Sequence, residues 1–193
     1  MKQTRWFSLA VAAGFALACP SAAVLSNEAA VDRGAEMLAP FKADLKAALE
    51  KGVMAGIPAA ISVCKEDAPD LAALYSVDGV VMGRSSHRLR NPLNTAPSWV
   101  DAVVEGYLDS GSDPQPVHTS LEDGRRGYVE PIMTQPVCLA CHGETLAPEV
   151  ASKIAAEYPD DQATGFDIGD LRGVFWVEYP GEIAESPGND NGG

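Results

Sequence analysis

Basic side chains are scarce in this sequence. It has 14 Lys and Arg residues against 27 Asp and Glu residues, which gives a net charge of −13. Binding to nucleic-acid phosphates needs clustered Lys and Arg, so the composition argues against nucleic acid as a partner. An acidic surface favours basic patches on protein partners and keeps a chain soluble. A solvated acidic surface with no specific partner fits the composition equally well.

The sequence also lacks a long hydrophobic run. Its longest apolar stretch, residues 6–18, is too short to span a bilayer comfortably. It follows Lys2 and Arg5, and small residues where a signal peptidase can cut lie on both sides of Cys19. We therefore interpret residues 1–23 as a cleaved signal peptide, which predicts a periplasmic or otherwise exported protein. The alternatives are an uncleaved anchor and a lipidated Cys19, which would make the chain a membrane-anchored lipoprotein.

Cysteine is infrequent, with four residues. Two disulfides are the first expectation for an exported protein, but the spacing argues otherwise. The pentapeptide Cys138-Leu139-Ala140-Cys141-His142 matches the c-type haem attachment motif. In that motif each thiol adds across a haem vinyl group, and the adjacent histidine binds the iron. We therefore predict one covalent haem c, held by Cys138 and Cys141 and ligated by His142.

Three other interpretations of this motif compete with haem attachment. A thioredoxin-like redox pair needs a preceding strand and a long helix that starts at the motif, and Gly143 and Pro148 interrupt such a helix. A structural zinc site needs four ligands, and the sequence has no second cysteine pair with this spacing. A chance match of five residues is the third. Export favours haem, because c-type haem is attached on the outer side of the bacterial membrane.

Cys64 is then left as a single thiol. Cys138 and Cys141 are assigned to haem, and Cys19 is either removed or lipidated. Free cysteines are often buried and inert, and an unpaired thiol in an exported protein can also bind a ligand. Spacing alone leaves both roles open.

Helices are expected first along the chain and strands afterwards. Apolar residues recur at helical spacing over 27–52, where Pro40 is expected to kink or split the helix and Gly52 to end it. Strands are predicted at residues 80–84, 117–121, 127–133 and 173–179. This order predicts the α+β class with a mostly antiparallel sheet. Residues 181–193, rich in Gly, Pro, Asn, Asp and Glu, are predicted to be a disordered tail.

Several segments together resemble a known family of single-haem c-type proteins with a PAS-like α+β domain. The resemblance covers about residues 35–180, and its segments occur in order and at plausible spacing. They are Ala60-Ile61-Ser62-Val63-Cys64, Ala68-Pro69, Gly83-Arg84-Ser85-Ser86, Arg88, Arg90-Asn91-Pro92, Asn94, Tyr128, Pro131-Ile132, the haem motif with Gly143, Tyr158-Pro159-Asp160, Ala163, Gly165, Gly169-Asp170 and Arg172-Gly173. The resemblance implies a PAS-like domain at 27–180, with helices packed around one covalently bound haem.

The resemblance also implies an unusual axial pair on the iron, His142 on one side and the Cys64 thiolate on the other. A thiolate donates electron density to ferric iron and lowers its reduction potential. Other side chains able to occupy the sixth position are also present. They are Met54, Met82, Met133, His87 and His118.

Arg84, Arg88 and Arg90 form a basic cluster in this acidic sequence. A guanidinium group binds a carboxylate as a two-pronged fork, so we expect at least one of them to contact a haem propionate. Arg84 and Arg90 are the stronger candidates. Ordinary surface arginines, or arginines paired with nearby carboxylates, are the alternative.

These assignments favour electron transfer with another exported redox protein, because a six-coordinate haem excludes small molecules. The alternative is a haem-based redox or diatomic-gas sensor that acts through a separate signalling protein. A haem enzyme needs an open distal site with acid–base residues, a role for which His87 and His118 are candidates. With Cys64 on the iron no such site exists, so we expect no enzyme activity.

Overall fold

The computed structural model describes residues 22–111 and 113–181 of the chain. Apart from residues 22, 23 and 181, the signal peptide and the tail predicted from the sequence lie outside these described residues. Both assignments stay predictions.

The described chain contains six α-helices, four strands and two short 3-10 helices. The α-helices are α1 (Ala22–Met54), α2 (Ile57–Lys65), α3 (Asp67–Tyr75), α4 (Ser98–Ser110), α5 (Leu139–His142) and α6 (Pro148–Glu157). The strands are β1 (Val81–Ser85), β2 (Val117–Ser120), β3 (Arg126–Met133) and β4 (Leu171–Tyr179). The 3-10 helices are η1 (Pro92–Asn94) and η2 (Pro136–Cys138).

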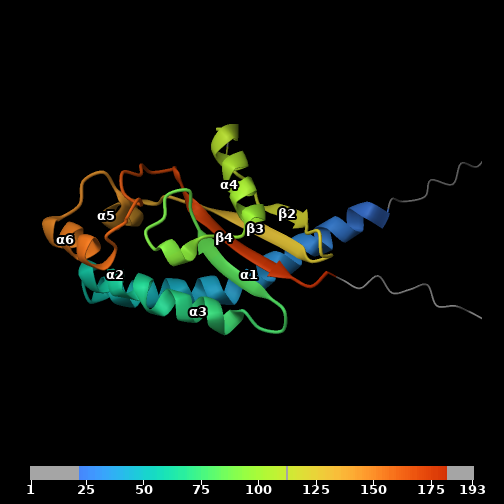
Figure 1. The fold of residues 1–193 in the computed structure, drawn as a ribbon, viewed down its shortest axis with the longest axis horizontal. Coiled ribbons are helices and arrows are strands. Elements are labelled where there is room, and N and C mark those ends of the chain that lie inside the picture. Colours follow the sequence, from blue (N-terminus) through green and yellow to red (C-terminus); the bar gives the residue numbers. More distant parts are fainter. Residues whose placement is uncertain (1–21, 112, 182–193) are drawn as a thin grey trace, which may run out of the picture.

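The four strands form one antiparallel sheet in the order β1-β4-β3-β2. The strands predicted at 80–84, 117–121, 127–133 and 173–179 each overlap one of them. Three helices precede the sheet along the chain, and Figure 1 shows helices beside both of its faces. The α+β class with a mostly antiparallel sheet is confirmed, whereas the PAS-like character of the domain stays a prediction.

Helix α1 lies along one face of the sheet. Leu38, Phe41 and Leu45 recur at helical spacing on its buried side and pack against the sheet. Of the two expected effects of Pro40, the split does not occur, because α1 continues through the proline, which lies on the exposed side; the kink stays a prediction. A proline inside a helix costs about 3 kcal/mol. Burial of apolar side chains both before and after Pro40 offsets that loss.

Gly52 does not end α1, which runs on to Met54. The glycine instead allows α2 to approach α1 closely. A Cβ atom at Gly52 would lie 2.8 Å from the Cα of Ala60, closer than real side chains come to a backbone atom. The two helices therefore pack together at Gly52, where no side chain larger than a hydrogen atom fits.

Alternate residues of β4 face opposite sides of the sheet, as the two-residue period of a strand requires. Val177 and Tyr179 belong to the core under α1 and α3. Val174 and Trp176 belong to the second core, which packs against α4. Helices α1 and α3 thus cover one face of the sheet, and α4 covers the other.

A third hydrophobic cluster lies at one end of the sheet and joins α2 to α6. It contains Ile61 from α2, together with Val150, Ile154 and Tyr158. Figure 1 shows α2, α5 and α6 together at this end. Among the described helices, none is both long and apolar enough to cross a membrane.

Candidate functional site

A cavity of about 430 Å³ lies at the end of the sheet where β1 and β3 finish and β4 begins. Its wall is formed by α1, α2, the segment from β1 to η1, the η2–α5 segment and the first residues of β4. Most of the lining is apolar, including Leu45, Leu49 and Val53 from α1 and Phe175 from β4. The volume and the lining are those of a site for a small molecule or a cofactor.

All six site residues predicted from the sequence line this cavity. They are Cys64, Arg84, Arg90, Cys138, Cys141 and His142. They come from α2, β1, the loop after β1, η2 and α5. The fold therefore brings together side chains from three separate parts of the chain, around residues 64, 84–90 and 138–142. Arg88 does not line the cavity.

The two motif cysteines lie in a short two-part helical segment. Cys138 ends η2, Cys141 lies in α5, and α5 ends one residue later at His142. Cys64, Cys138 and Cys141 are all free thiols. The long helix that a thioredoxin-like motif requires is missing at this place. Within the described residues, no three His, Cys, Asp or Glu side chains gather closely enough to hold a metal ion, which also disfavours structural zinc.

The His142 ring is fixed by a loop formed by residues 161–166, hereafter the 161–166 loop. Nδ1 of His142 donates a hydrogen bond to the carbonyl oxygen of Ala163 at 2.6 Å. The backbone of the same loop is bonded to the motif, since Phe166 N donates to His142 O at 2.9 Å and Gly165 N donates to Gly143 O at 3.0 Å. This arrangement leaves Nε2 as the unprotonated ring nitrogen, which carries the lone pair.

The imidazole of His142 is held neutral at physiological pH. Burial lowers its pKa to about 3, helped by the positive charges of Arg172 and Arg90, while the hydrogen bond to Ala163 opposes the shift. Neutral imidazole is the protonation state that binds metal ions.

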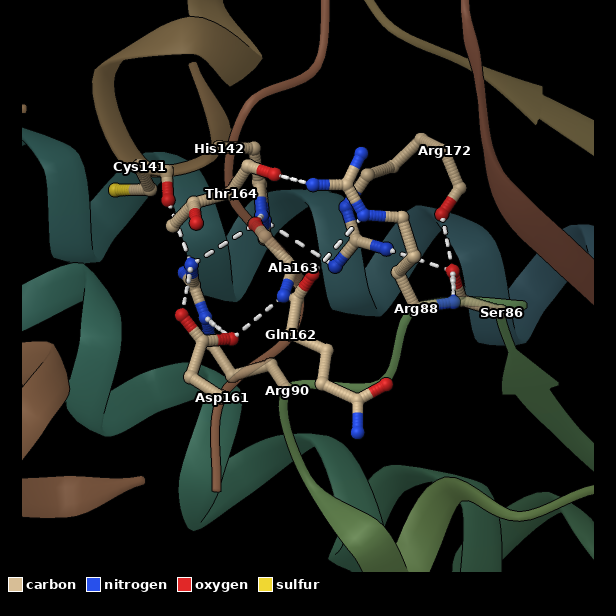
Figure 2. A network of polar contacts seen from close by, with 10 residues as sticks. All are labelled: Ser86, Arg88, Arg90, Cys141, His142, Asp161, Gln162, Ala163, Thr164 and Arg172. Atoms are coloured by element: carbon tan, nitrogen blue, oxygen red, sulfur yellow. Dashed lines mark hydrogen bonds and ion pairs between the residues drawn. The ribbon is translucent and has the colours of Figure 1, made fainter. Parts of the chain in front are cut away.

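Arg90 joins the 161–166 loop to the cysteine motif, as Figure 2 shows. Its guanidinium forms a two-pronged ion pair with Asp161, with N···O distances of 3.0 and 3.1 Å. The same group donates to the carbonyl oxygen of Cys141 at 2.7 Å and to that of Ala163 at 3.1 Å. Ala163 O thus accepts from both Arg90 and His142. Arg90 is buried, and its contacts position the motif; its predicted contact with a propionate stays a prediction.

Arg88 holds the same loop from outside the cavity. Its guanidinium donates to the carbonyl oxygens of Gln162, Thr164 and Gly165. It also lies over the ring of Phe166, with its central carbon 4.3 Å from the ring centre. Two arginines therefore fix the loop that contacts His142.

Arg84 and Arg172 also line the cavity, and their side chains make fewer and longer polar contacts than those of Arg88 and Arg90. Nη2 of Arg84 donates to the carbonyl oxygen of Cys64 at 3.3 Å. Arg172 contacts Ser86 Oγ at 3.3 Å and His142 Nε2 at 3.4 Å, and its buried Nε has no hydrogen-bond partner. Burial, together with the charges of Arg90 and Arg84, lowers the pKa of Arg172 to about 10, so it remains charged at neutral pH.

Cys64 lies in the last turn of α2 and faces the same cavity as the motif cysteines. Burial raises the pKa of the Cys141 thiol, and the nearby Cys64 and Cys138 thiols raise it further against the opposing effect of Arg90. Among the described residues, none of the other proposed sixth ligands lines the cavity. These are Met54, Met82, Met133, His87 and His118.

The model of a family described as Tll0287-like: Tll0287 matches residues 26–180. The chain belongs to the Tll0287-like family. One matching solved structure is the crystal structure of the cyanobacterial heme-protein Tll0287, at 28% sequence identity and a TM-score of 0.48. That match covers 60% of this chain and 68% of the other. A search of curated proteins found no match.

Three residues of the Tll0287-like site had no individual role in the sequence analysis. Asp161 and Ala163 fix Arg90 and His142, and Arg172 lines the cavity. Asp161 lies 71 residues from Arg90 and Arg172 lies 30 residues from His142, so no local pattern pairs them. The one sequence signal for these residues is that Ala163 and Arg172 are among the residues that carry the family resemblance.

Proposed function

We propose that this protein is an exported c-type cytochrome with a PAS-like domain, which carries one haem c and transfers electrons at low potential. Its partner is another exported redox protein. The observation that carries the proposal is the state of His142 in the cavity wall. Its Nδ1 donates to the Ala163 carbonyl, which leaves Nε2 as the unprotonated ring nitrogen that could bind a metal. Metal-binding histidines commonly donate their other ring N–H in this way.

Cys138 and Cys141 hold the cofactor covalently in this proposal. Each thiol would add across one vinyl group of the haem, which would form a sulfur–carbon bond and transfer the thiol proton to the neighbouring carbon without an oxidant. Both cysteines are free and line the cavity beside His142. The apolar walls of α1 suit a large planar ring, and cationic side chains suit its carboxylates.

Cys64 would supply the second protein ligand to the iron of a bound haem. It is supported by its place in the cavity wall, where the five alternative ligands are missing from the described lining. When bound, haem supplies a one-electron iron couple, and a thiolate ligand lowers the potential of that couple.

We propose electron transfer rather than catalysis because of which residues line the cavity. His87 and His118, the candidate acid–base groups, are absent from the described lining of the cavity, so no proton-transfer group of that kind faces the iron position. With His142 and Cys64 both bound to the iron, small molecules would be excluded and only an electron would need to pass.

The test is to express the full chain with a c-type haem maturation system and to record ferric and ferrous spectra with and without carbon monoxide. Low-spin thiolate-type ferric spectra in the wild type, lost in Cys64→Ala and kept in Ser62→Ala on the same helix, support the proposal. The reduced wild type is expected not to bind carbon monoxide. Ready binding of carbon monoxide by the reduced wild type would favour a gas sensor over an electron carrier.

A further inference from the structure

The charged residues of the cavity wall are all of one sign. The lining contains five basic side chains and, among the described residues, no Asp or Glu. They are Lys42, Lys46, Arg84, Arg90 and Arg172. This is the reverse of the whole chain, in which acidic residues outnumber basic ones almost two to one.

Three of these five cations have an acidic partner that is not part of the cavity lining. Lys42 pairs with Glu130 and Lys46 pairs with Glu50. Arg90 forms its buried ion pair with Asp161. The positive charge of each is therefore already balanced within the protein.

Arg84 and Arg172 have no such partner. Within the described residues no carboxylate lies at ion-pair distance from either guanidinium, and the polar contacts of both are long, at 3.3–3.4 Å. Both side chains are half-buried. Taking an unpaired charge even partly out of water is costly, since it gives up hydration without recovering an ion pair. Two unbalanced guanidinium groups in one cavity wall therefore favour a ligand with two negative charges.

We propose that Arg84 and Arg172 bind the two carboxylates of the haem, and that Arg90 does not. This inference rests on the proposed function and identifies which side chains hold the acidic edge of the cofactor. Guanidinium groups suit this role because their parallel N–H bonds match the two oxygens of a carboxylate. Arg90 is set aside because its Nε and Nη2 already bind Asp161, Cys141 and Ala163.

The contact between Arg172 and His142 agrees with this assignment. Nη2 of Arg172 donates to the Nε2 lone pair of His142, the same lone pair that an iron ligand role requires. One lone pair cannot serve both, so iron ligation by His142 requires the Arg172 guanidinium to leave this position and turn to another acceptor. Its buried Nε also lacks a partner, which leaves two adjacent donors of one guanidinium fork for a carboxylate.

The test compares haem with its dimethyl ester, in which both carboxylates are neutral. Both are titrated into the full chain carrying Cys138→Ala and Cys141→Ala, so that binding is reversible. We expect haem to bind roughly 10-fold or more tightly than the ester, as for charge-assisted hydrogen bonds. Adding Arg172→Met or Arg84→Met should reduce this preference several-fold, and adding both should abolish it.

Two variants serve as controls. Arg126→Met, on the exposed part of β3, should leave the affinities for haem and for its ester unchanged. Arg90→Met should keep the preference for haem over the ester even if both affinities fall. Arg172→Lys serves if methionine disrupts folding; it should lose part of the preference, because lysine keeps the charge without the fork. A preference that survives the double substitution, or that Arg90→Met abolishes, overturns this inference alone. If neither porphyrin binds, the proposed function fails and this inference with it.

Discussion

The carbonyl oxygen of Ala163 accepts hydrogen bonds from both Nδ1 of His142, at 2.6 Å, and Nη2 of Arg90, at 3.1 Å. A single backbone atom thus links the histidine of the motif to a buried ion pair. Asp161 completes the arrangement, since its carboxylate binds Arg90 and also accepts from the backbone N–H of Ala163 at 2.9 Å. The orientation of the His142 ring therefore depends on residues far from the motif in sequence.

Breaking the Arg90–Asp161 pair should destabilise the protein and loosen His142. Both side chains are about 10% exposed, so Asp161→Asn leaves a buried guanidinium without its counter-charge. Loss of one partner of a buried pair costs about 3 kcal/mol or more. Chemical denaturation of the holoprotein should show this loss of stability. The haem reduction potential should also shift, because an imidazole held less firmly by Ala163 binds the iron differently.

The exposed pair Lys46–Glu50 provides the control for that experiment. Its side chains are 75% and 62% exposed, so Glu50→Gln should change the free energy of unfolding by about 0.5 kcal/mol at most and leave the potential unchanged. Equal effects of Asp161→Asn and Glu50→Gln would contradict a positioning role for the buried pair.

The alternative axial ligands should be replaceable without effect on the haem spectrum. Met133→Leu and His118→Gln remove two of them, and neither residue lines the cavity. We expect the low-spin ferric spectrum of the holoprotein to be the same in wild type and in both variants. Loss of that spectrum in either variant, with Cys64 intact, would identify a different sixth ligand.

Two helical glycines should respond to alanine in opposite ways. Gly52→Ala places a Cβ 2.8 Å from the backbone of Ala60, so α1 and α2 must separate, at a cost of about 1–3 kcal/mol. Gly106 lies in α4 with open space around it, so Gly106→Ala should stabilise the protein by about 0.5–1 kcal/mol. Denaturation curves of the two variants measure both effects. A neutral Gly52→Ala would mean that the two helices do not pack this closely.

The link between α2 and α6 should weaken in acid. Hydrogen bonds from Lys153 and Lys65 lower the pKa of Glu157 to about 2 from an ordinary 4.5. Because the folded-state pKa is depressed, this stabilisation is fully present above about pH 4.5 and is lost as the pH falls towards 2.

Thermal unfolding midpoints between pH 6 and pH 2 test this directly. Glu157→Gln should lower the midpoint near neutral pH and flatten its fall below pH 4.5. Ser152→Ala, on the same helix and without a titrating group, should follow the wild-type curve. A Glu157→Gln curve parallel to that of the wild type would contradict the assignment.

Sequence patterns predicted the features of this protein that depend on residues close together in the chain. The cysteine motif is contiguous, and Cys138, Cys141 and His142 do line one cavity. Turn residues mark the start of β1, after Asp78-Gly79, and the hairpin between β2 and β3, at Glu122-Asp123-Gly124. Pro40 misled the interpretation of α1, because the burial of residues on both sides of the proline is decided by the sheet and not by the helix itself.

The remaining features depend on long-range contacts. Nothing beside Arg90 in sequence shows that its partner is Asp161, or that Arg172 lines the same cavity with no carboxylate partner among the described residues. Both facts are decided by how the 161–166 loop and the start of β4 meet the motif. Only the folded chain brings these segments together.

Covalent attachment of haem at Cys138 and Cys141 can be measured as the mass of the chain expressed with a c-type haem maturation system. We predict an increase by the mass of one haem that survives acid–organic extraction, resides on the peptide containing Cys138 and Cys141, and is absent when both cysteines are replaced by alanine. A mature chain without covalent haem, under conditions that load a control cytochrome c, would contradict the account.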